Sequence, residues 1–405
     1  MIPLAEARAR VLGGLEPLPP VEVALDEAVG AVCAETVLAR EAVPPFDNSS
    51  MDGYALRAAD TLRAPARLRL VEAVFAGHAA TTSVGPGEAA RIMTGAPVPP
   101  GADSVCRQED TTRDGDTVEV GRRVALGESI RRTGEDVTIG QELLVAGDVV
   151  TPAHRGVLAG QGRTHLRVHP RARVGVLSTG DELVDEGPLG PGQIRDTNRP
   201  TLLAALGAEG FRPVDLGHAA DRPEAVAAAL RRGVETCDAV ISTGGVSVGD
   251  ADFVKGAVAE LCADRSWSMR VAMRPGKPFT FGRAPGGQPL FALAGNPVST
   301  LVGFEVFVRP ALRALAGHRD PDRPRVEGLC DVALARRPDG RTHLVHVKAA
   351  FGPDGRVHVV AAARLGSHLL HAVASCNALA VLDDGDGVAA GAPVPLLLLG
   401  PVPGV

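Results

Sequence analysis

The chain has 405 residues, a formal net charge of −6 and 45% hydrophobic residues. This length predicts several domains, because single hydrophobic cores rarely grow beyond about 250–300 residues. The negative charge excludes a general attraction for nucleic acid, and no apolar run reaches the roughly 18 residues that a membrane-spanning helix needs.

The N-terminal segment and the cysteines indicate a cytoplasmic protein. Residues 1–14 contain Arg8 and Arg10 but no apolar stretch after them, so we expect no signal peptide. The six cysteines are widely spaced and include no Cys-x-x-Cys pair. This spacing argues against a zinc or redox motif and favours buried thiols in a reducing compartment.

The first half of the chain predicts helices on either side of a β-rich segment. An Ala/Val/Leu pattern over residues 22–37 predicts a helix, which the Val43-Pro44-Pro45 break follows. Residues 44–139 are rich in turn signals with short β-rich runs such as 67–75, and predict a small all-β insertion. Thr151-Pro152 then fits the start of another helix, with Thr as the N-cap.

Residues 171–318 predict an α/β domain. Strand-like runs begin at Arg173, Ala239 and Leu290, and helical segments alternate with them. This alternation is typical of a doubly wound, mostly parallel sheet with helices on both faces. Beyond about Pro321 the helical periodicity stops, and alternating segments such as 342–347 predict a small β domain.

Three of the predicted strands end in loops rich in Gly, Ser and Thr, at 178–182, 242–249 and 294–299. In open parallel sheets, ligands bind beyond the carboxyl ends of the strands. Small residues there let backbone N–H groups approach an anion, and the helices that follow add a favourable dipole. A single such loop is weak evidence, since glycine is common at strand ends, but three loops in one sheet predict an anion site.

Carboxylates accompany these loops. They are Asp181, Glu182, Asp221, Asp250 and Asp252. Oxygen ligands beside an anion-binding loop are the usual way to hold Mg²⁺, which carboxylates and phosphate share. A structural alternative is open for each: Asp221 and Glu224 also fit a capping box, and the last two aspartates fit caps of a helix beginning near Phe253.

Residues 273–279 (MRPGKPF) form the fourth element of the predicted site. Two cations and two prolines in so short a segment predict a stiff, positively charged turn. The alternative is a solvated loop with incidental charges. Because the chain is acidic overall, we interpret Arg274 and Lys277 as a local site for a tetrahedral oxyanion.

Taken in order, the motifs resemble those of a known family. The clearest are residues 45–55 (PFDNSSMDGYA) and 91–99 (RIMTGAPVP) in the predicted insertion. Further matches are residues 130–136, 178–183, 196–199, 242–252, 274–279, 295–299 and 366–368. The chain is similar to the molybdopterin molybdenumtransferases, which include bacterial MoeA and the gephyrin E domain.

The resemblance implies a transferase that inserts molybdate into adenylylated molybdopterin and releases AMP with Mg²⁺, which yields molybdenum cofactor. It implies a homodimer, with the molybdopterin adenylyltransferase and apo-molybdoenzymes as expected protein partners. The implied domains are a discontinuous linker domain (1–43 and 140–170), a β-rich insertion (44–139), a molybdopterin-binding α/β domain (171–318) and a C-terminal β-barrel (319–405).

Residue roles combine the motifs with the resemblance. For the pterin phosphate, the expected residues are Thr179, Gly244, Gly245 and Ser247. The metal or the attacking water is assigned to Glu182, Asp221 and Asp252, the first two as metal ligands. The residues expected to hold molybdate or another part of the substrate are Arg274, Lys277, Ser299 and Ser367. From the insertion, the resemblance adds Asp52, Thr94 and Asp136, which would face the partner subunit across a dimer cleft.

Two positions depart from the family pattern. Ala294 stands where Pro usually precedes Gly-Asn-Pro, and we expect a looser loop there. His346 stands where an Arg is expected, and a neutral imidazole is a weaker oxyanion partner than a guanidinium. The second departure predicts a lower or pH-dependent affinity for molybdate.

Two alternatives are open, and the departures bear on the first of them. One is a paralogue with an altered oxyanion substrate, or a non-catalytic scaffold or carrier of molybdopterin. The other is the adenylyltransferase of the same pathway. That enzyme would not need the insertion or the barrel, and its glycine loop typically reads Thr-Gly-Gly-Thr-Gly instead of the Thr-Gly-Gly-Val-Ser found from Thr243.

Overall fold

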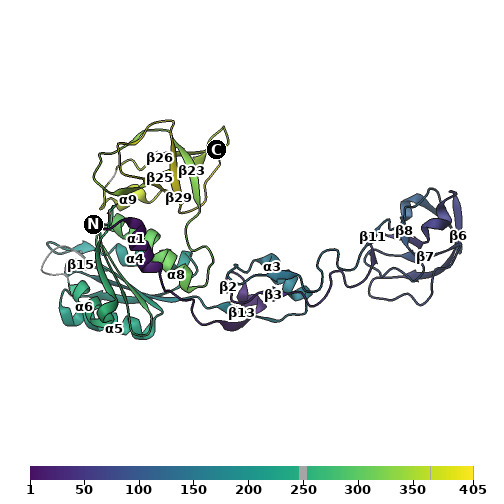
Figure 1. The fold of residues 1–405 in the computed structure, drawn as a ribbon, viewed down its shortest axis with the longest axis horizontal. Coiled ribbons are helices and arrows are strands. Elements are labelled where there is room, and N and C mark those ends of the chain that lie inside the picture. The colour runs from purple at the N-terminus through teal and green to yellow at the C-terminus, as the bar shows by residue number, and fades with distance from the viewer. Residues whose placement is uncertain (246–252, 365, 405) are drawn as a thin grey trace. The chain divides into compact units, whose positions relative to one another are not determined.

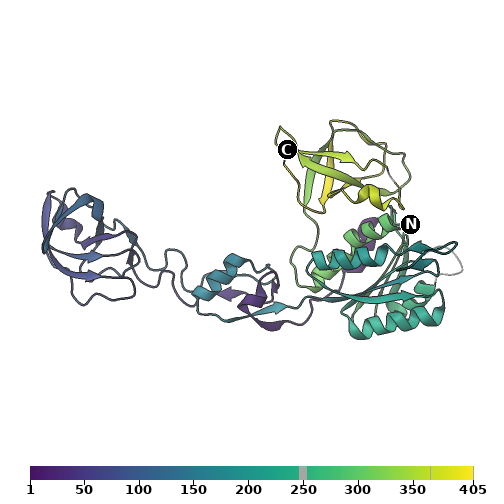
Figure 2. The ribbon, with the colours of Figure 1, turned by 180° about the vertical axis from the view of Figure 1, so that it is seen from behind.

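The computed structural model describes residues 1–245, 253–364 and 366–404. It contains two compact units. The main unit comprises residues 1–34, 146–151 and 165 to the C-terminal end, and the insertion unit comprises residues 35–145 and 152–164 (Figures 1 and 2).

A mixed sheet forms the centre of the main unit. Its strand order is β17 (Arg212–Ala219), β14 (Arg173–Thr179), β18 (Ala239–Thr243), β22 (Pro289–Leu293), β21 (Pro278–Arg283) and β19 (Ser266–Arg270). The first four strands are parallel; β21 pairs antiparallel with β22, and β19 pairs antiparallel with β21 at the edge. All residues of β18 and β22 are buried, as expected for strands with both faces covered.

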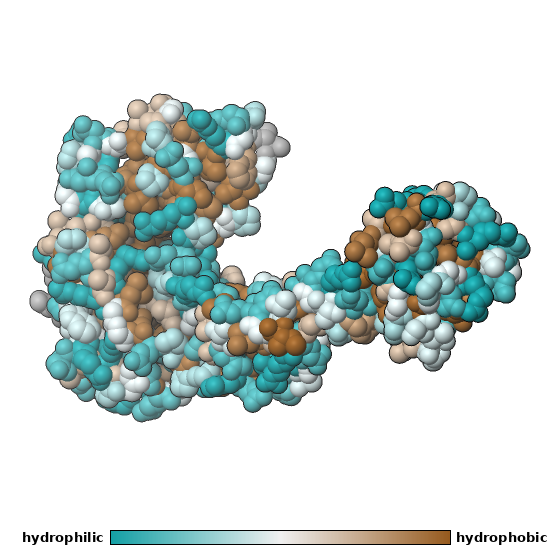
Figure 3. Space-filling view, turned by 45° about the vertical axis from the view of Figure 1, so that its right-hand side comes forward, coloured by the Kyte–Doolittle hydropathy of each residue, from teal (hydrophilic) through white to brown (hydrophobic). Residues whose placement is uncertain are grey.

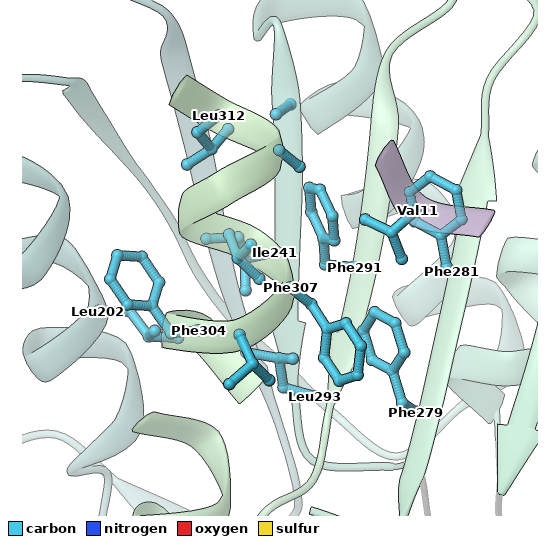
Figure 4. Packing of buried hydrophobic residues seen from close by; sticks show 14 of the residues in the cluster. Val11, Leu202, Ile241, Phe279, Phe281, Phe291, Leu293, Phe304, Phe307 and Leu312 are labelled. Carbon is cyan, nitrogen blue, oxygen red and sulfur yellow. The ribbon is translucent and has the colours of Figure 1, made fainter. Parts of the chain in front are cut away.

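Helices cover both faces of this sheet, and each face has its own hydrophobic core (Figures 1 and 2). One face carries α5 (Pro223–Thr236) and α6 (Phe253–Cys262). The other carries α1 (Leu4–Leu12), α4 (Asn198–Ala208), α7 (Pro297–Gly303) and α8 (Arg309–Leu315), with a π-helical turn at Phe304–Val308. On that face Phe279 and Phe307 stack with ring centroids 4.3 Å apart (Figure 4).

The C-terminal part of the main unit is a closed barrel. The described residues form the ring β25 (Thr342–Phe351), β26 (Val357–Ala361), β23 (Arg325–Cys330), β29 (Pro393–Leu398) and β27 (Ala378–Leu382), which closes because β27 also pairs with β25. Smaller elements are β24 (Leu334–Ala335), β28 (Gly387–Val388) and α9 (Leu370–Val373). The short strand β20 (Met273–Arg274) pairs in parallel with the start of β25, so a segment of the α/β part adjoins the barrel.

The helix predicted over residues 22–37 is wrong. The structure has β1 (Val21–Ala24), a single helical turn α2 (Leu25–Ala28), β2 (Val32–Cys33) and β3 (Val37–Leu38). Valine favours strands because its branched Cβ restricts χ1, and Gly30 has φ +82°, which a helix does not allow. The partner of β1 and β2 is β13 (His165–His169), far away in the sequence.

The insertion unit is β-rich, as predicted. Its main sheet has the order β8 (Ser104–Arg107), β5 (Gly53–Leu56), β7 (Glu88–Ile92), β6 (Ala66–Val74), β10 (Thr117–Val120) and β9 (Thr111–Asp114). Smaller elements are β4 (Asn48–Ser49), β11 (Ile130–Arg131), β12 (Glu142–Leu144) and α3 (Pro152–Gly160). The α/β centre, the β insertion and the barrel together confirm the predicted fold class.

No helix of the described residues is both long enough and apolar enough to cross a membrane. Over the face drawn in Figure 3, hydrophilic residues are interspersed with hydrophobic ones on each unit.

The junction between α8 and the barrel contains a buried ionic network. Glu209, at the end of α4, accepts a hydrogen bond from Arg309 at 2.9 Å and pairs with Arg323 at 2.8 Å. Arg323 also pairs with Glu305 at 2.8 Å. His318 lies beside this network, where its Nδ1 accepts a hydrogen bond of 3.1 Å from Arg313. Burial and the neighbouring arginines lower the pKa of His318 to about 4.

We predict that His318 makes the main unit sensitive to acid. A histidine whose folded pKa lies below its unfolded value binds a proton more readily when unfolded. Above about pH 6.5 the histidine is neutral in both states and does not lower the free energy of unfolding. As the pH drops toward 4, the unfolded state takes up the proton first, and the free energy of unfolding falls by at most about 1.4 kcal/mol per pH unit. His318→Asn, which keeps an acceptor, should lose less Tm between pH 7 and pH 5 than the parent protein in calorimetry. Exposed His371→Asn is the control, and equal losses in all three proteins would contradict the prediction.

Candidate functional site

Three of the predicted loops meet at the carboxyl edge of the α/β sheet. β14, β18 and β22 are parallel, so their ends at Thr179, Thr243 and Leu293 lie side by side. A Cβ added to Gly244 would lie 2.4 Å from the Thr179 carbonyl oxygen, and one on Gly295 would lie 3.6 Å from the Gly244 Cα. The structure therefore brings the first, second and third loops into contact, as the sequence predicted.

Glycine is required where these loops touch. Gly244 and Gly245 have φ of +91° and +62°, and an added Cβ at Gly245 would lie 2.7 Å from Val254. Thr179 is 2% exposed, and its hydroxyl has no hydrogen-bond partner among the described residues. Thr179, Gly244 and Gly245, here called the cradle, therefore pack closely around an unsatisfied hydroxyl. Glycine-rich loops of this kind suit an anionic group. Ser247, the fourth residue expected here, lies outside the described residues.

The first loop also contacts the backbone of the β17–α5 turn. Asp181 accepts a hydrogen bond of 3.0 Å from the backbone N–H of Asp221, and His218 contacts the Gly180 carbonyl at 2.7 Å. Glu182 is exposed and folds back toward Gly180. The N-cap position of α5 is occupied by Arg222 without any side-chain capping bond. The capping alternative for Asp221 is therefore wrong.

The metal site is incomplete in the described part of the chain. Among those residues, no group of three His, Cys, Asp or Glu side chains is arranged to hold a metal ion. Asp250 and Asp252, which the sequence placed here, lie outside the described residues. Glu182 and Asp221 remain as carboxylates near the cradle, and one or two carboxylates with substrate phosphates are a usual donor set for Mg²⁺.

A cavity of about 710 Å³ lies between the α/β part and the barrel, within the main unit. Its lining includes all four residues that the sequence assigned to molybdate or substrate, namely Arg274, Lys277, Ser299 and Ser367. Two backbone contacts hold these segments together: β20 pairs with β25 through Arg274 and His343, and the Val298 N–H donates to the Ser367 carbonyl at 3.0 Å.

The barrel adds cations that the sequence interpretation missed. They are Arg336, Arg337, Arg341 and Arg364. Asp339 balances part of this charge, because it pairs with Arg336 at 3.0 Å and with Arg341. The hydrogen bonds from Arg341 and His343 lower the pKa of Asp339. Within the described chain, the lining cations without a carboxylate partner are Arg274, Lys277, Arg337 and Arg364.

The sequence contains a pattern that could have indicated these cations. Residues 336–341 (RRPDGR) repeat the chemistry of residues 273–279, since they combine several arginines with a proline and a glycine in a short turn. Nothing in the sequence indicated that this second turn lies opposite the first. That proximity depends on the closure of the barrel and on the β20–β25 pairing.

The two departures from the family pattern have different outcomes. His346 lines the cavity but is only 5% exposed, and burial lowers its pKa to about 4. It is therefore neutral at pH 7, and the expected pH dependence from this residue does not arise near neutrality. Ala294 is held in place, because the Thr300 hydroxyl donates to its carbonyl at 2.6 Å. The expected loosening is therefore offset by a hydrogen bond.

In the insertion unit, the predicted residues Asp52 and Thr94 are in contact. The Asp52 carboxylate accepts hydrogen bonds from the Thr94 backbone at 2.7 Å and from its hydroxyl at 2.8 Å, and both bonds lower the pKa of Asp52. For Asp136, the structure gives a backbone bond to Val43 at 2.9 Å. Asp47, which the sequence interpretation overlooked, binds the Thr133 N–H at 2.8 Å.

Comparisons with known proteins agree with this architecture. The model of the MoeA N-terminal region (domain I and II) matches residues 2–162, that of the “Probable molybdopterin binding domain” matches 175–314, and that of the MoeA C-terminal region (domain IV) matches 333–399. A solved structure of the molybdopterin biosynthesis MoeA protein from Pyrococcus horikoshii has a TM-score of 0.84 and 29% identity, over 98% of this chain and 100% of that chain.

Two curated relatives bear the same enzyme name. Molybdopterin molybdenumtransferase 2 of Mycobacterium tuberculosis is 40% identical over 384 residues, which is 92% of this chain and 93% of the relative. Molybdopterin molybdenumtransferase of Haemophilus influenzae is 36% identical over 390 residues, which is 96% of each. The chain is therefore a transferase of molybdenum cofactor biosynthesis that belongs to the molybdopterin molybdenumtransferase family.

Proposed function

We propose that this chain inserts molybdate into adenylylated molybdopterin and releases AMP, which yields molybdenum cofactor. The observation that carries the proposal is the cavity of about 710 Å³ with cations that no described carboxylate neutralises. Positive side chains that lie together in a recess are stabilised when an anion binds and neutralises their charge. Molybdate is a tetrahedral dianion, and the lining supplies both cations and the hydroxyls of Ser299 and Ser367 for its oxygens.

The cradle formed by Thr179, Gly244 and Gly245 would bind the pterin phosphate through backbone N–H groups and the free threonine hydroxyl. Ser247 would join this cradle. In this arrangement the phosphate lies at the sheet edge and the oxyanion lies at the barrel interface. Gly295 and Ser299 belong to the loop and helix that connect the two sites, so one bound substrate would be held at both ends.

Mg²⁺ fits the donor chemistry near the cradle, with Glu182 and Asp221 as the carboxylate ligands and Asp252 as a further candidate. When bound, it would neutralise phosphate charge that develops as the anhydride is cleaved. The chain's own part is to orient the anhydride and the attacking water. Asp221 is suited to this, because its backbone is fixed by Asp181 and its carboxylate does not cap α5.

Further proposals concern assembly, location, partners and domain limits. The protein would act as a homodimer in the cytoplasm, and Asp52, Thr94 and Asp136 would complete the site of the partner subunit. The molybdopterin adenylyltransferase would supply its substrate and apo-molybdoenzymes would accept its product. The domain limits would be those inferred from the sequence, at residues 43/44, 139/140, 170/171 and 318/319.

The central experiment is an insertion assay. Purified protein is incubated with adenylylated molybdopterin, Mg²⁺ and molybdate, and both AMP release and reconstitution of an apo-molybdoenzyme are followed. We expect both signals to require molybdate. AMP release that ignores molybdate, together with no reconstitution, would refute the proposal and favour a carrier or a paralogue with another oxyanion.

Lys277→Ala should weaken the use of molybdate. The loss of a charged hydrogen-bond donor costs about 1.5–3 kcal/mol, which corresponds to roughly a 10- to 150-fold higher KM for molybdate. The KM for adenylylated molybdopterin should change little. Lys348→Ala removes an exposed lysine of the barrel and is the matched control. If Lys277→Ala keeps the parent KM for molybdate, this lysine does not belong to the oxyanion site.

Asp221→Asn should slow anhydride cleavage. The amide keeps the size of the side chain but removes the charge that holds a metal or orients water, so we expect kcat for AMP release to fall about 100-fold, a typical loss when a positioned group is removed. The KM for molybdate should stay unchanged. Exposed Asp264→Asn serves as the control, and parent-like AMP release by Asp221→Asn would remove this residue from the site.

A further inference from the structure

The motif Asp196-Thr197-Asn198-Arg199 has no role in the proposed function, yet it lies directly beneath the loops of the cradle. It begins α4, and its side chains reach three strands of the sheet. Asp196 is the first element of this arrangement. Its side chain is 1% exposed, and its Oδ1 accepts the N–H groups of Asn198 at 3.0 Å and Arg199 at 3.2 Å. These bonds fix the first turn of α4.

Asp196 and Arg199 then attach this turn to the sheet. Ser178, at the end of β14, donates its hydroxyl to Asp196. Arg199 is 8% exposed and donates from Nη1 to both carboxylate oxygens of Asp215 on β17, at 2.6 and 2.7 Å. Bidentate pairs of this kind are strong and directional. The start of α4 is therefore a rigid base that is bound to two neighbouring strands.

From this base the Asn198 side chain reaches the end of β18 and the loop after β22. Its Nδ2 donates to the Thr243 hydroxyl at 2.8 Å and to the Gly295 carbonyl at 2.6 Å. A carbonyl oxygen only accepts, so the contact with Gly295 fixes which end of the amide faces it. One amide group therefore joins the end of β18 to the loop after β22, next to the point where Gly244 and Gly295 approach each other.

This connection is kept at an energetic cost. The Asn198 Oδ1 is buried and has no hydrogen-bond partner among the described residues, and such an unsatisfied oxygen costs about 1–3 kcal/mol. Stability alone would favour a side chain without this oxygen. Costs of this kind are concentrated at functional sites, where geometry matters more than stability.

We propose that Asn198 is a positioning residue: it holds the Thr243–Gly245 loop and the Gly295 loop at the separation that the pterin phosphate requires. The proposal rests on the proposed function, since it assumes that the cradle binds molybdopterin. Without the amide, β18 and β22 stay paired up to Thr243 and Leu293, but the loops beyond them lose their side-chain link. A displacement of about 1 Å at a binding site can cost on the order of 100-fold. In the described part of the chain, the hydrogen bonds of the Asn198 side chain go to Thr243 and Gly295 and to neither oxyanion residue, Arg274 or Lys277.

The test compares Asn198→Ala with Thr201→Ala in the full-length chain. Thr201 lies on the same helix, but its hydroxyl donates only to the local carbonyl of Thr197 at 2.7 Å. Equilibrium dialysis with molybdopterin should give a Kd at least tenfold higher for Asn198→Ala and within twofold of the parent for Thr201→Ala. In the insertion assay, Asn198→Ala should raise the KM for adenylylated molybdopterin and leave the KM for molybdate unchanged. An unchanged Kd, or an equal rise in both KM values, would overturn the proposal.

A second variant changes the acceptor of the Asn198 hydrogen bond instead of its donor. Thr243→Val removes the hydroxyl that accepts from Asn198 and nearly keeps the side-chain volume. The same hydroxyl also contacts the Ala294 carbonyl at 3.4 Å and the Thr300 hydroxyl at 3.5 Å. Thr243→Val should therefore weaken molybdopterin binding at least as much as Asn198→Ala, and the double variant should be little worse than Thr243→Val alone. If Asn198→Ala fails to fold, Thr243→Val carries the test, and parent-like binding by Thr243→Val would then overturn the proposal.

Hydrogen exchange separates this proposal from the proposed function, because it needs no ligand. The amides of residues 242–245 and 294–296 should exchange at least tenfold faster in Asn198→Ala than in the parent or in Thr201→Ala. Unchanged exchange would overturn the positioning role even if the enzyme inserts molybdate. Faster exchange in a protein that releases no AMP would support the connection and refute the proposed function alone.

Discussion

The site depends on the burial of a parallel sheet on both faces. Because β14, β18 and β22 run in the same direction, their last residues reach the same edge, and the loops that follow must share the space there. The two hydrophobic cores on opposite faces keep these strands in register. Small residues then become necessary at the crossing points, as at Gly244, where a Cβ would collide with the Thr179 carbonyl.

The two halves of the site use different chemistry. At the sheet edge, glycine backbone packs closely against a buried hydroxyl, whereas at the barrel interface arginine and lysine side chains line a cavity of about 710 Å³. The first arrangement is fixed by the fold of one domain. The second requires the barrel to lie beside residues 273–279, and the β20–β25 pairing provides that contact.

Local signals could be predicted from the sequence, and long-range contacts could not. The loops after β14, β18 and β22, and the roles of Arg274 and Lys277 as cavity cations, follow from composition and position. The helix predicted at residues 22–37 was wrong because its valines pair with a strand near residue 167, and sequence periodicity does not record the partner. Arg337 and Arg364 were overlooked for the same reason.

The buried histidines of the cavity wall have a consequence for selectivity. His346 is neutral at pH 7, and burial also lowers the pKa of His343. The positive charge of the recess is thus supplied by arginine and lysine side chains and not by imidazoles. Burial of the two histidines therefore limits how far acidity changes the charge that an anion meets there. An oxyanion that gains a proton as the acidity rises loses charge and affinity, whereas one that stays a dianion keeps both.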